Sequence, residues 1–336
     1  MFRTIKRVAP VLFTGVVIAS TMGSAQALEK VRVTIAASSG NYSPYFAAIE
    51  KGYYKEEGFE VEIIKAGGGT ATPALMSGSV DFSTSGASAL SAILRGAPLK
   101  LVFFPWDRPT YQVWSTTKTI TKLSQIKGKA VGIQTRGDTF EISMRMLLQK
   151  QGINPNSVAY TPLGYGSGRT AAITAGSLPV VVLSQFDVER LRPAGGLKNG
   201  NMLFNMYNVV RMPYTGIAVS ADALAKNPER IKRFVRACIK GLAYMAAHKD
   251  GTVKIVSKYN KRTPPAAIAI EYVGVRASKT DGGVVPEELQ REEVRVRAAL
   301  IGVKPDKIPA LSKIFDFRLA IEINRELAAS GWKPTE

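Results

Sequence analysis

The segment that decides the fold is Val31–Ile64, VRVTIAASSGNYSPYFAAIEKGYYKEEGFEVEII, whose pattern predicts a strand, a loop, a helix and a second strand. Val31–Ile35 alternates apolar and polar residues, as a strand does. Pro44 opens the helix, and Gly52 ends it, because glycine adopts a left-handed cap without steric cost. The second strand follows at Phe59–Ile64. This order predicts an α/β fold in which helices join parallel strands.

The same alternation continues along the chain, with a short helix expected from Pro73 to Met76, and divides it into two series. The second series begins after Tyr111–Thr116, and a return strand at Val209–Ser220 brings the chain back to a mostly helical C-terminal part. We therefore predict two Rossmann-like α/β lobes joined by a hinge of two segments. The first lobe comprises residues 28–112 and 215–336, and the second comprises residues 113–214. Ligands of open α/β sheets bind at the carboxyl ends of the strands, so the cleft between the lobes is the expected ligand site.

The first 27 residues have the pattern of a secretory signal peptide. Three basic residues precede an apolar stretch, Val8–Ala19, which is followed by small residues ending in Ala25-Gln26-Ala27. The apolar stretch is too short to span a bilayer, which needs about 20 residues. We expect cleavage after Ala27 and export to the periplasm. The only cysteine, Cys238, lies far from the cleavage site, so no lipid anchor and no intrachain disulfide are predicted.

The composition excludes several classes of function. The chain carries 45 basic and 26 acidic residues, but these are scattered, without the basic and aromatic block of a nucleic-acid-binding protein. The positive charge instead favours anionic ligands or an anionic membrane surface. A single histidine, His248, excludes a histidine-rich metal site. The sequence around Ser85 lacks a Gly-x-Ser-x-Gly elbow, and no Gly-Lys-Ser/Thr follows the triple glycine. We predict no cofactor, no metal and no catalytic residue.

Four motifs, in order along the chain, carry a resemblance to a known family. They are Ser38–Glu62, SSGNYSPYFAAIEKGYYKEEGFEVE; Ala74–Phe82, ALMSGSVDF; Leu123–Gly132, LSQIKGKAVG; and Ala221–Ala247, where Asn227-Pro228-Glu229 opens a long helix. Together they resemble the type II periplasmic binding proteins that serve ABC importers of sulfonates, taurine, nitrate and thiamine-pyrimidine precursors. The segment Ser177–Val181, SLPVV, departs from the family's usual Val-Asp-Ala strand, so we expect this part of the pocket, and with it the ligand, to differ.

The resemblance implies a type II periplasmic binding protein fold and a solute-binding function. The expected protein is a monomer that closes on a small anionic, aromatic or heterocyclic solute and delivers it to an inner-membrane ABC permease with a cytoplasmic ATPase. Two alternatives stay open at this point. One is an enzyme, a pyrimidine synthase of the thiamine pathway, since such proteins resemble the same fold and consume a histidine. The other is a periplasmic subunit that presents its ligand to a signalling receptor.

Loops at the predicted strand ends supply the candidate ligand-binding residues. A solute receptor needs uncharged donors and helix N-termini that converge on a cleft, and each loop taken alone is equally typical of a tight turn. In the first lobe the candidates are Ser38, Asn41, Tyr42, Gly68, Thr70, Ser85, Gly86 and Ala87. In the second lobe and the return segment they are Thr135, Arg136, Asp138, Thr139, Tyr165, Ser167, Gln185 and Tyr214.

One candidate residue and one group of aromatic residues near the first crossing have a structural alternative. Arg136 either clamps an anionic group through its planar guanidinium or points to solvent and pairs with Asp138. The aromatic residues Tyr111, Trp106 and Trp114 either line an apolar wall of the cleft or pack in the hinge.

Overall fold

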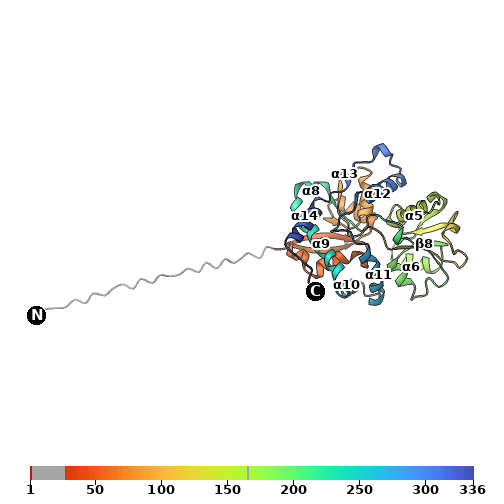
Figure 1. The fold of residues 1–336 in the computed structure, drawn as a ribbon, viewed down its shortest axis with the longest axis horizontal. Coiled ribbons are helices and arrows are strands. Elements are labelled where there is room, and N and C mark those ends of the chain that lie inside the picture. The colour runs from red at the N-terminus through yellow and green to blue at the C-terminus, as the bar shows by residue number, and fades with distance from the viewer. Residues whose placement is uncertain (2–26, 165) are drawn as a thin grey trace.

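The computed structural model describes Met1 and residues 27–164 and 166–336. The predicted signal peptide comprises residues 1–27, of which only Met1 and Ala27 are among the described residues. Two bodies lie side by side in Figure 1, one built from the N-terminal strands and C-terminal helices and the other from the middle of the chain. Each is built around its own five-stranded sheet, and we call the elements around the two sheets the first half and the second half.

The first sheet has the strand order β2-β1-β3-β10-β4. β1 (Glu29–Ile35) pairs in parallel with β2 (Phe59–Lys65) and with β3 (Phe82–Ser83), as the sequence predicts for strands joined by helices. β10 (Ile217–Ser220) enters antiparallel between β3 and β4 (Leu99–Phe103). The carboxyl ends of β1 and β3 therefore meet at one edge of the sheet.

The second sheet repeats this pattern with the order β7-β6-β8-β5-β9. β6 (Ala130–Ile133) is parallel to β7 (Ala159–Pro162) and to β8 (Val180–Ser184). β5 (Tyr111–Ser115) is antiparallel to both β8 and β9 (Met202–Asn205). Each sheet thus contains one antiparallel strand, β10 in the first half and β5 in the second, that directly follows a crossing of the chain from the other half. This arrangement arises because the chain crosses between the halves twice.

The two crossings lie against each other. The first connects β4 to β5 and contains Trp106, and the second connects β9 to β10 and contains Tyr214. Tyr214 N donates to Trp106 O at 3.1 Å, and Met212 N donates to Asp107 O at 2.8 Å. The indole of Trp106 is fully buried and donates to Asn41 O at 2.8 Å, so this residue packs at the crossing. The predicted division at residues 112 and 113 falls inside β5, and the lobe limits stay a prediction.

Fourteen α-helices of four or more residues appear in the described part of the chain. The predicted return strand over Val209–Ser220 is wrong for its first eight residues, because that stretch is the crossing and only β10 pairs in a sheet. The helix expected from Pro73 starts earlier, at Gly68, so Pro73 lies inside it. The bounds are α1 Ser43–Glu50, α2 Tyr53–Glu56, α3 Gly68–Met76, α4 Gly86–Ile93, α5 Thr139–Lys150, α6 Gly166–Thr174, α7 Gln185–Leu191, α8 Ala221–Lys226, α9 Pro228–Ala247, α10 Lys249–Tyr259, α11 Pro265–Ala277, α12 Glu287–Leu300, α13 Leu311–Ile314 and α14 Arg318–Ala329.

The long helix α9 organises the first half. Its apolar face is buried, and Phe234 stacks on Phe82 of β3 with ring centroids 3.5 Å apart. A Cβ atom at Gly241 would lie 2.1 Å from Pro44 O, so glycine is needed where α9 crosses α1. None of the described helices is long and apolar enough to cross a membrane.

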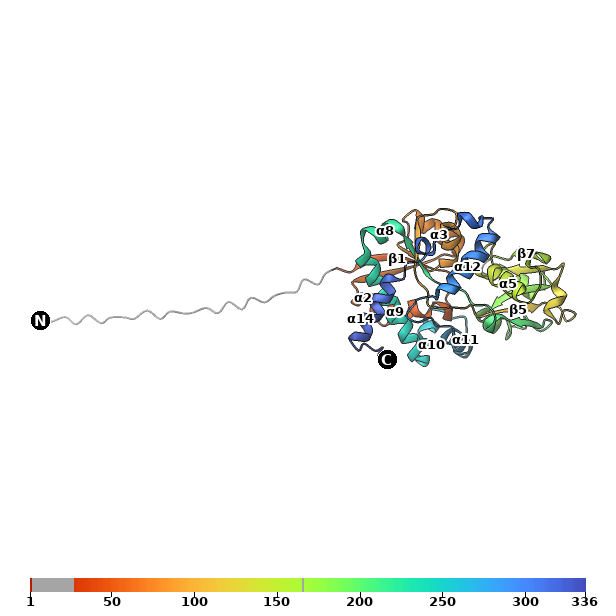
Figure 2. The same cartoon turned by 45° about the horizontal axis from the view of Figure 1, so that its top comes forward.

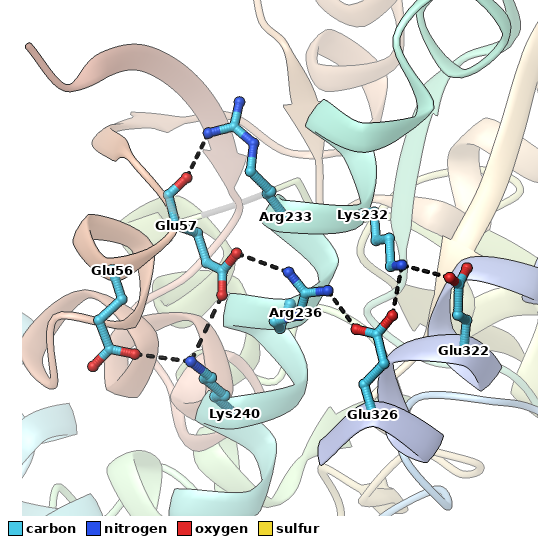
Figure 3. Close-up of polar contacts among 8 residues, drawn as sticks. All are labelled: Glu56, Glu57, Lys232, Arg233, Arg236, Lys240, Glu322 and Glu326. Carbon is cyan, nitrogen blue, oxygen red and sulfur yellow. Dashed lines mark hydrogen bonds and ion pairs between the residues drawn. The ribbon is translucent and has the colours of Figure 1, made fainter. Parts of the chain in front are cut away.

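The basic face of α9 forms an ionic network, part of which Figure 3 shows. Arg236 bridges Glu57, next to α2, at 3.1 Å and Glu326 of α14 at 2.6 Å. Lys232 contacts the same Glu326 at 2.7 Å. These contacts join α9 to α2 and to α14, which lie about ninety or more positions away in the sequence. Glu326 is partly exposed, so the network contributes modestly to stability beside the apolar packing.

Candidate functional site

A cavity of about 290 Å³ lies between the two halves, at the carboxyl ends of their parallel strands. The loop that follows β1 forms one wall, and the N-terminal turns of α5 and α7 with one turn of α6 form the other. Tyr111 and Tyr214 close it on the side of the crossings. The lining residues are Ala36, Ala37, Ser39, Asn41, Tyr42, Tyr111, Gln134, Thr139, Phe140, Arg169, Ser184, Phe186, Asp187, Arg190 and Tyr214.

A buried arginine is the most unusual residue of this cavity. Arg169 of α6 is only 4% exposed, and its Nη1 lies 3.0 Å from Asp187 Oδ2. Its Nη2 donates to Val182 O at 2.8 Å. Its Nε is buried and has no hydrogen-bond partner among the described residues. A buried donor without an acceptor is costly, so Arg169 keeps one unused donor at a site where a solute could supply the acceptor.

Asp187 is shared between two arginines. It caps α7, where its Oδ2 accepts from Ser184 N at 3.1 Å and from Ser184 Oγ at 2.8 Å. Its Oδ1 lies 3.5 Å from Nη2 of Arg190, whose Nε is also buried and has no partner within the described part of the chain. We call Arg169, Asp187 and Arg190 the arginine cluster. Two guanidinium groups face one carboxylate, so the cluster carries a net positive charge.

Aromatic rings surround the arginine cluster. Tyr111 stacks on Phe140 with centroids 4.2 Å apart and meets Tyr214 edge-on at 5.5 Å. The guanidinium of Arg169 lies over Phe140 at 5.1 Å, and that of Arg190 lies over Phe186 at 5.9 Å. Such cation–π contacts fix the planes of the guanidinium groups.

The phenol groups of the cavity are linked by hydrogen bonds. Tyr111 Oη donates to Tyr214 Oη at 3.1 Å and shares a hydrogen bond of 2.8 Å with Thr139 Oγ1. Burial raises the pKa of both Tyr111 and Tyr214 well above the usual value, because the charged phenolate is poorly solvated there. Both phenols are therefore neutral at physiological pH and offer hydroxyl groups rather than charges.

The loop after β1 is held from behind by a buried acid. Gly40 N donates to Glu271 Oε2 at 2.8 Å, and Asn41 Nδ2 lies 3.5 Å from Glu271 Oε1. Burial raises the pKa of Glu271 to about 8, while the Gly40 hydrogen bond opposes that rise. A Cβ atom at Gly40 would lie 3.0 Å from the Glu271 carboxyl, so this close support requires glycine.

A smaller cavity of about 70 Å³ adjoins the first and shares Ala36, Tyr42, Gln134, Thr139 and Tyr214 with it. The N-terminal turn of α4 lines it, and Asp138 lies opposite. Asp138 accepts from Thr135 N at 2.8 Å and from Glu141 N at 3.0 Å, so it caps α5. Burial raises its pKa to about 6, which these backbone donors partly offset.

The structure brings together most, but not all, of the residues predicted from the sequence. Asn41, Tyr42, Thr139 and Tyr214 line the larger cavity, and Tyr42, Gly68, Ser85, Gly86, Ala87, Asp138, Thr139 and Tyr214 line the smaller one. Gly86 and Ala87 lie in the first turn of α4, and Gly68 lies in the first turn of α3, rather than in loops before these helices. Tyr165 and the side chain of Ser167 lie outside the described residues.

Five predicted residues lie elsewhere. Ser38 Oγ accepts from Lys65 Nζ at 2.7 Å, and Thr70 is exposed and donates to Gly67 O. Gln185 is the first residue of α7 and accepts from Gln112 at 2.6 Å. Thr135 and Arg136 line a separate groove of about 550 Å³ near α12. Arg136 is 61% exposed there and lies 3.8 Å from Glu141, so its partner is not Asp138.

The arginine cluster is what sequence reasoning missed. One local signal was present, because Ser184 and Asp187 have the Ser-x-x-Asp spacing of a helix cap directly after an apolar strand. Nothing local identifies Arg169, which lies eighteen positions before its partner and is buried by contacts with Asp187, Val182 and Phe140 of other elements.

Comparisons with known proteins agree with this architecture. Residues 39–252 match the family model described as NMT1/THI5 like. The riboflavin-binding protein RibY of Chloroflexus aurantiacus is 29% identical over 220 residues, which cover 62% of this chain and 60% of that protein. The 4-amino-5-hydroxymethyl-2-methylpyrimidine phosphate synthase of Schizosaccharomyces pombe is 28% identical over 209 residues, 58% of this chain and 59% of that one. The chain thus spans about 60% of the length of these curated relatives.

Solved structures show the fold. The putative periplasmic sulfonate-binding protein SsuA from Methylobacillus flagellatus has a TM-score of 0.71 at 19% identity and covers 92% of this chain and 98% of its own. The periplasmic nitrate-binding protein NrtA from Synechocystis has a TM-score of 0.69 at 15% identity, with 89% of each chain covered. The predicted type II periplasmic binding protein fold is confirmed.

Proposed function

This chain belongs to the NMT1/THI5-like family, and from that premise we propose that it is the solute-binding component of an ABC importer. It works in the periplasm, captures a small molecule in the cavity between its two halves and delivers it to an inner-membrane permease driven by a cytoplasmic ATPase. The observation that carries the proposal is the cavity itself, which combines a buried arginine that retains an unused donor with a wall of aromatic rings. Concave, partly apolar sites with a few placed polar groups are typical of small-molecule binding.

The two crossings support a hinge mechanism. Tyr214 lies at the second crossing and Tyr111 lies at the end of the first, so the residues that close the cavity are next to the segments that would bend. Asn41 lines the cavity from the first half and Arg169 lines it from the second. A solute that contacts both Asn41 and Arg169 makes all its contacts only when the two halves are close together. It therefore binds the closed form more tightly than the open form, and this difference in affinity drives closure.

The synthases among the relatives give the rival proposal, an enzyme that consumes its own histidine. The position of the only histidine weighs against it. His248 lies at the end of α9, where its Nε2 contacts Pro334 O at 3.1 Å and its ring lies 4.7 Å from Tyr244. It is not among the residues that line the cavity, and the described lining of that cavity includes no lysine. A periplasmic subunit that presents its ligand to a signalling receptor would use the same cavity. Whether a permease or a signalling receptor is encoded beside the gene distinguishes these two functions.

A thermal-shift screen of the purified, processed protein tests the proposal, because a ligand that binds only the native state raises the melting temperature. Oxyanions, sulfonates, aromatic carboxylates, pyrimidines and flavins form the panel. A saturable rise with one class supports a solute receptor, and small-angle scattering with that ligand should show a smaller radius of gyration. If no class raises the melting temperature, the proposal fails. Pyridoxal phosphate on a lysine, or loss of His248 by mass spectrometry, would establish the synthase instead.

A further inference from the structure

The balance of charged side chains at the cavity indicates the sign of the charge that its ligand carries. Asp187 is the only carboxylate among the described lining residues, and its oxygens already contact both arginines and Ser184. Glu271 lies behind the loop after β1 rather than in the lining, and its raised pKa of about 8 leaves it largely protonated at neutral pH. The second guanidinium is therefore not compensated by any group at the cavity. An anionic ligand would supply the missing charge.

The geometry of the donors favours an oxyanion. Arg169 is held on three sides by Asp187, Val182 O and the face of Phe140, so its guanidinium has little freedom to turn. The Nε atom that remains without a partner is therefore preorganised. Arg190 brings a second such Nε beside the same carboxylate. Charge-assisted hydrogen bonds from guanidinium to carboxylate or sulfonate are the strongest that such donors can form.

The remaining lining favours a flat, apolar body. Phe140 and Phe186 each lie next to one guanidinium of the cluster, and Tyr111 stacks on Phe140 and meets Tyr214 edge-on, so aromatic rings with neutral hydroxyl groups adjoin the cluster. Aromatic rings pack best on other rings in stacked or edge-on arrangements. The volume of about 290 Å³ lies at the low end for ligand cavities, which suits a compound of about one ring.

We infer that the solute is a small aromatic compound with one carboxylate or comparable oxyanion group, which the arginine cluster binds while the ring packs against the aromatic side chains that line the cavity. This inference rests on the proposed function and narrows it to one chemical class. It makes Arg169 a residue that selects for charge and assigns the preference for a flat ring to the aromatic lining of the cavity.

Matched probes test the requirement for a charge and the requirement for an aromatic ring separately. Benzoate and nicotinate carry both features, benzamide and nicotinamide lack the charge, and cyclohexanecarboxylate lacks the aromatic face. We expect calorimetric titration to show that the aromatic anions bind roughly ten- to a hundredfold more tightly than their amides, as expected for loss of a charge-assisted contact. Cyclohexanecarboxylate should also bind more weakly than benzoate.

Variants then assign the selectivity to the cluster. Arg169→Gln should abolish the preference for benzoate over benzamide, and Arg169→Lys should restore it only in part, because lysine lacks the planar donor pair. Arg192→Gln is the matched control, since Arg192 is exposed, lies next to α7 and does not line the cavity. If Arg169→Gln does not fold, the partly exposed Arg190 replaces it in the same comparison.

The outcomes separate this inference from the proposed function. A neutral or saturated probe that binds as tightly as its aromatic anion, or an unchanged preference in the arginine variants, overturns the inference while the solute-receptor function stands. If neither these probes nor any class in the thermal-shift panel binds, the function itself fails. Tight binding of a sulfonate or nitrate without a ring, in preference to benzoate, also rejects the aromatic assignment.

Discussion

Replacement of Arg297 should destabilise the protein by about 3–5 kcal/mol, because it breaks a buried ion pair where the two halves meet. Arg297 of α12 is fully buried, and its Nε donates to Glu293 Oε1 at 3.0 Å. Its Nη1 donates to Ser91 Oγ at 3.0 Å in the first half and to Gly137 O at 2.7 Å in the second. Figures 1 and 2 show α12 between the body of the first half and α5, so this side chain spans the boundary.

The magnitude follows from what each substitution leaves behind. Arg297→Met leaves the carboxylate of Glu293 without its ion-pair partner. Glu293 is 1% exposed, and one of its oxygens already has no partner among the described residues. Breaking a buried ion pair from one side costs about 3–5 kcal/mol. For a chain of this length the unfolding entropy is roughly 0.65 kcal/mol per kelvin, so the melting temperature should fall by about 5–8 °C. Replacing both residues, Arg297→Met with Glu293→Leu, leaves no unpaired charge and should cost less than either single change.

Melting curves of the processed protein followed by circular dichroism measure these differences. Arg291→Met is the matched control, because Arg291 lies on the same helix and pairs with Glu287 at an exposed position. Its loss should change the free energy of unfolding by less than about 1 kcal/mol. If the costs of the two buried substitutions add in the double variant, or if the control is equally destabilised, the assignment of Arg297 to a buried pair is refuted.

Three further predictions concern pH, salt and processing. Burial raises the pKa of Glu271 to about 8 from 4.5, so the folded protein holds a proton that the unfolded chain releases between these values, and stability should fall as pH rises through that window. Glu271→Gln should flatten the decline between pH 5 and 8.5 in melting curves, and an unchanged slope would contradict this. Glu326→Gln, which breaks contacts to Lys232 and Arg236, should cost less than about 1 kcal/mol, and the cost should shrink in 0.5 M NaCl; a cost that persists in salt would mean the network is not screened. Sequencing of the periplasmic protein should give Leu28 as the first residue, and an intact Met1 would disprove cleavage.

Local patterns in the sequence sufficed to predict most of the architecture. β1, α1 and β2 lie within a few residues of their predicted limits, because alternation of apolar residues and stop signals such as Gly52 act over neighbouring positions. The limits of α3 were missed for a local reason as well. Proline is common at the first turn of a helix, yet Pro73 lies inside α3. A Cβ atom at Gly68 would lie 1.8 Å from Ser88 Oγ, so glycine at the start of α3 serves close packing on α4 rather than a loop.

By itself the sequence determined that strands and helices alternate in two series and that small polar residues follow the strands. It did so because turn chemistry and periodicity depend on residues a few positions apart. Only the tertiary structure decided which side chains meet. Arg136 and Arg169 are equally basic in the sequence, but the first lies exposed in an outer groove, and the second is buried against Asp187 in the cavity. That choice depends on how α5, α6 and α7 pack around β8, and contacts between distant elements leave no periodic signal in the chain.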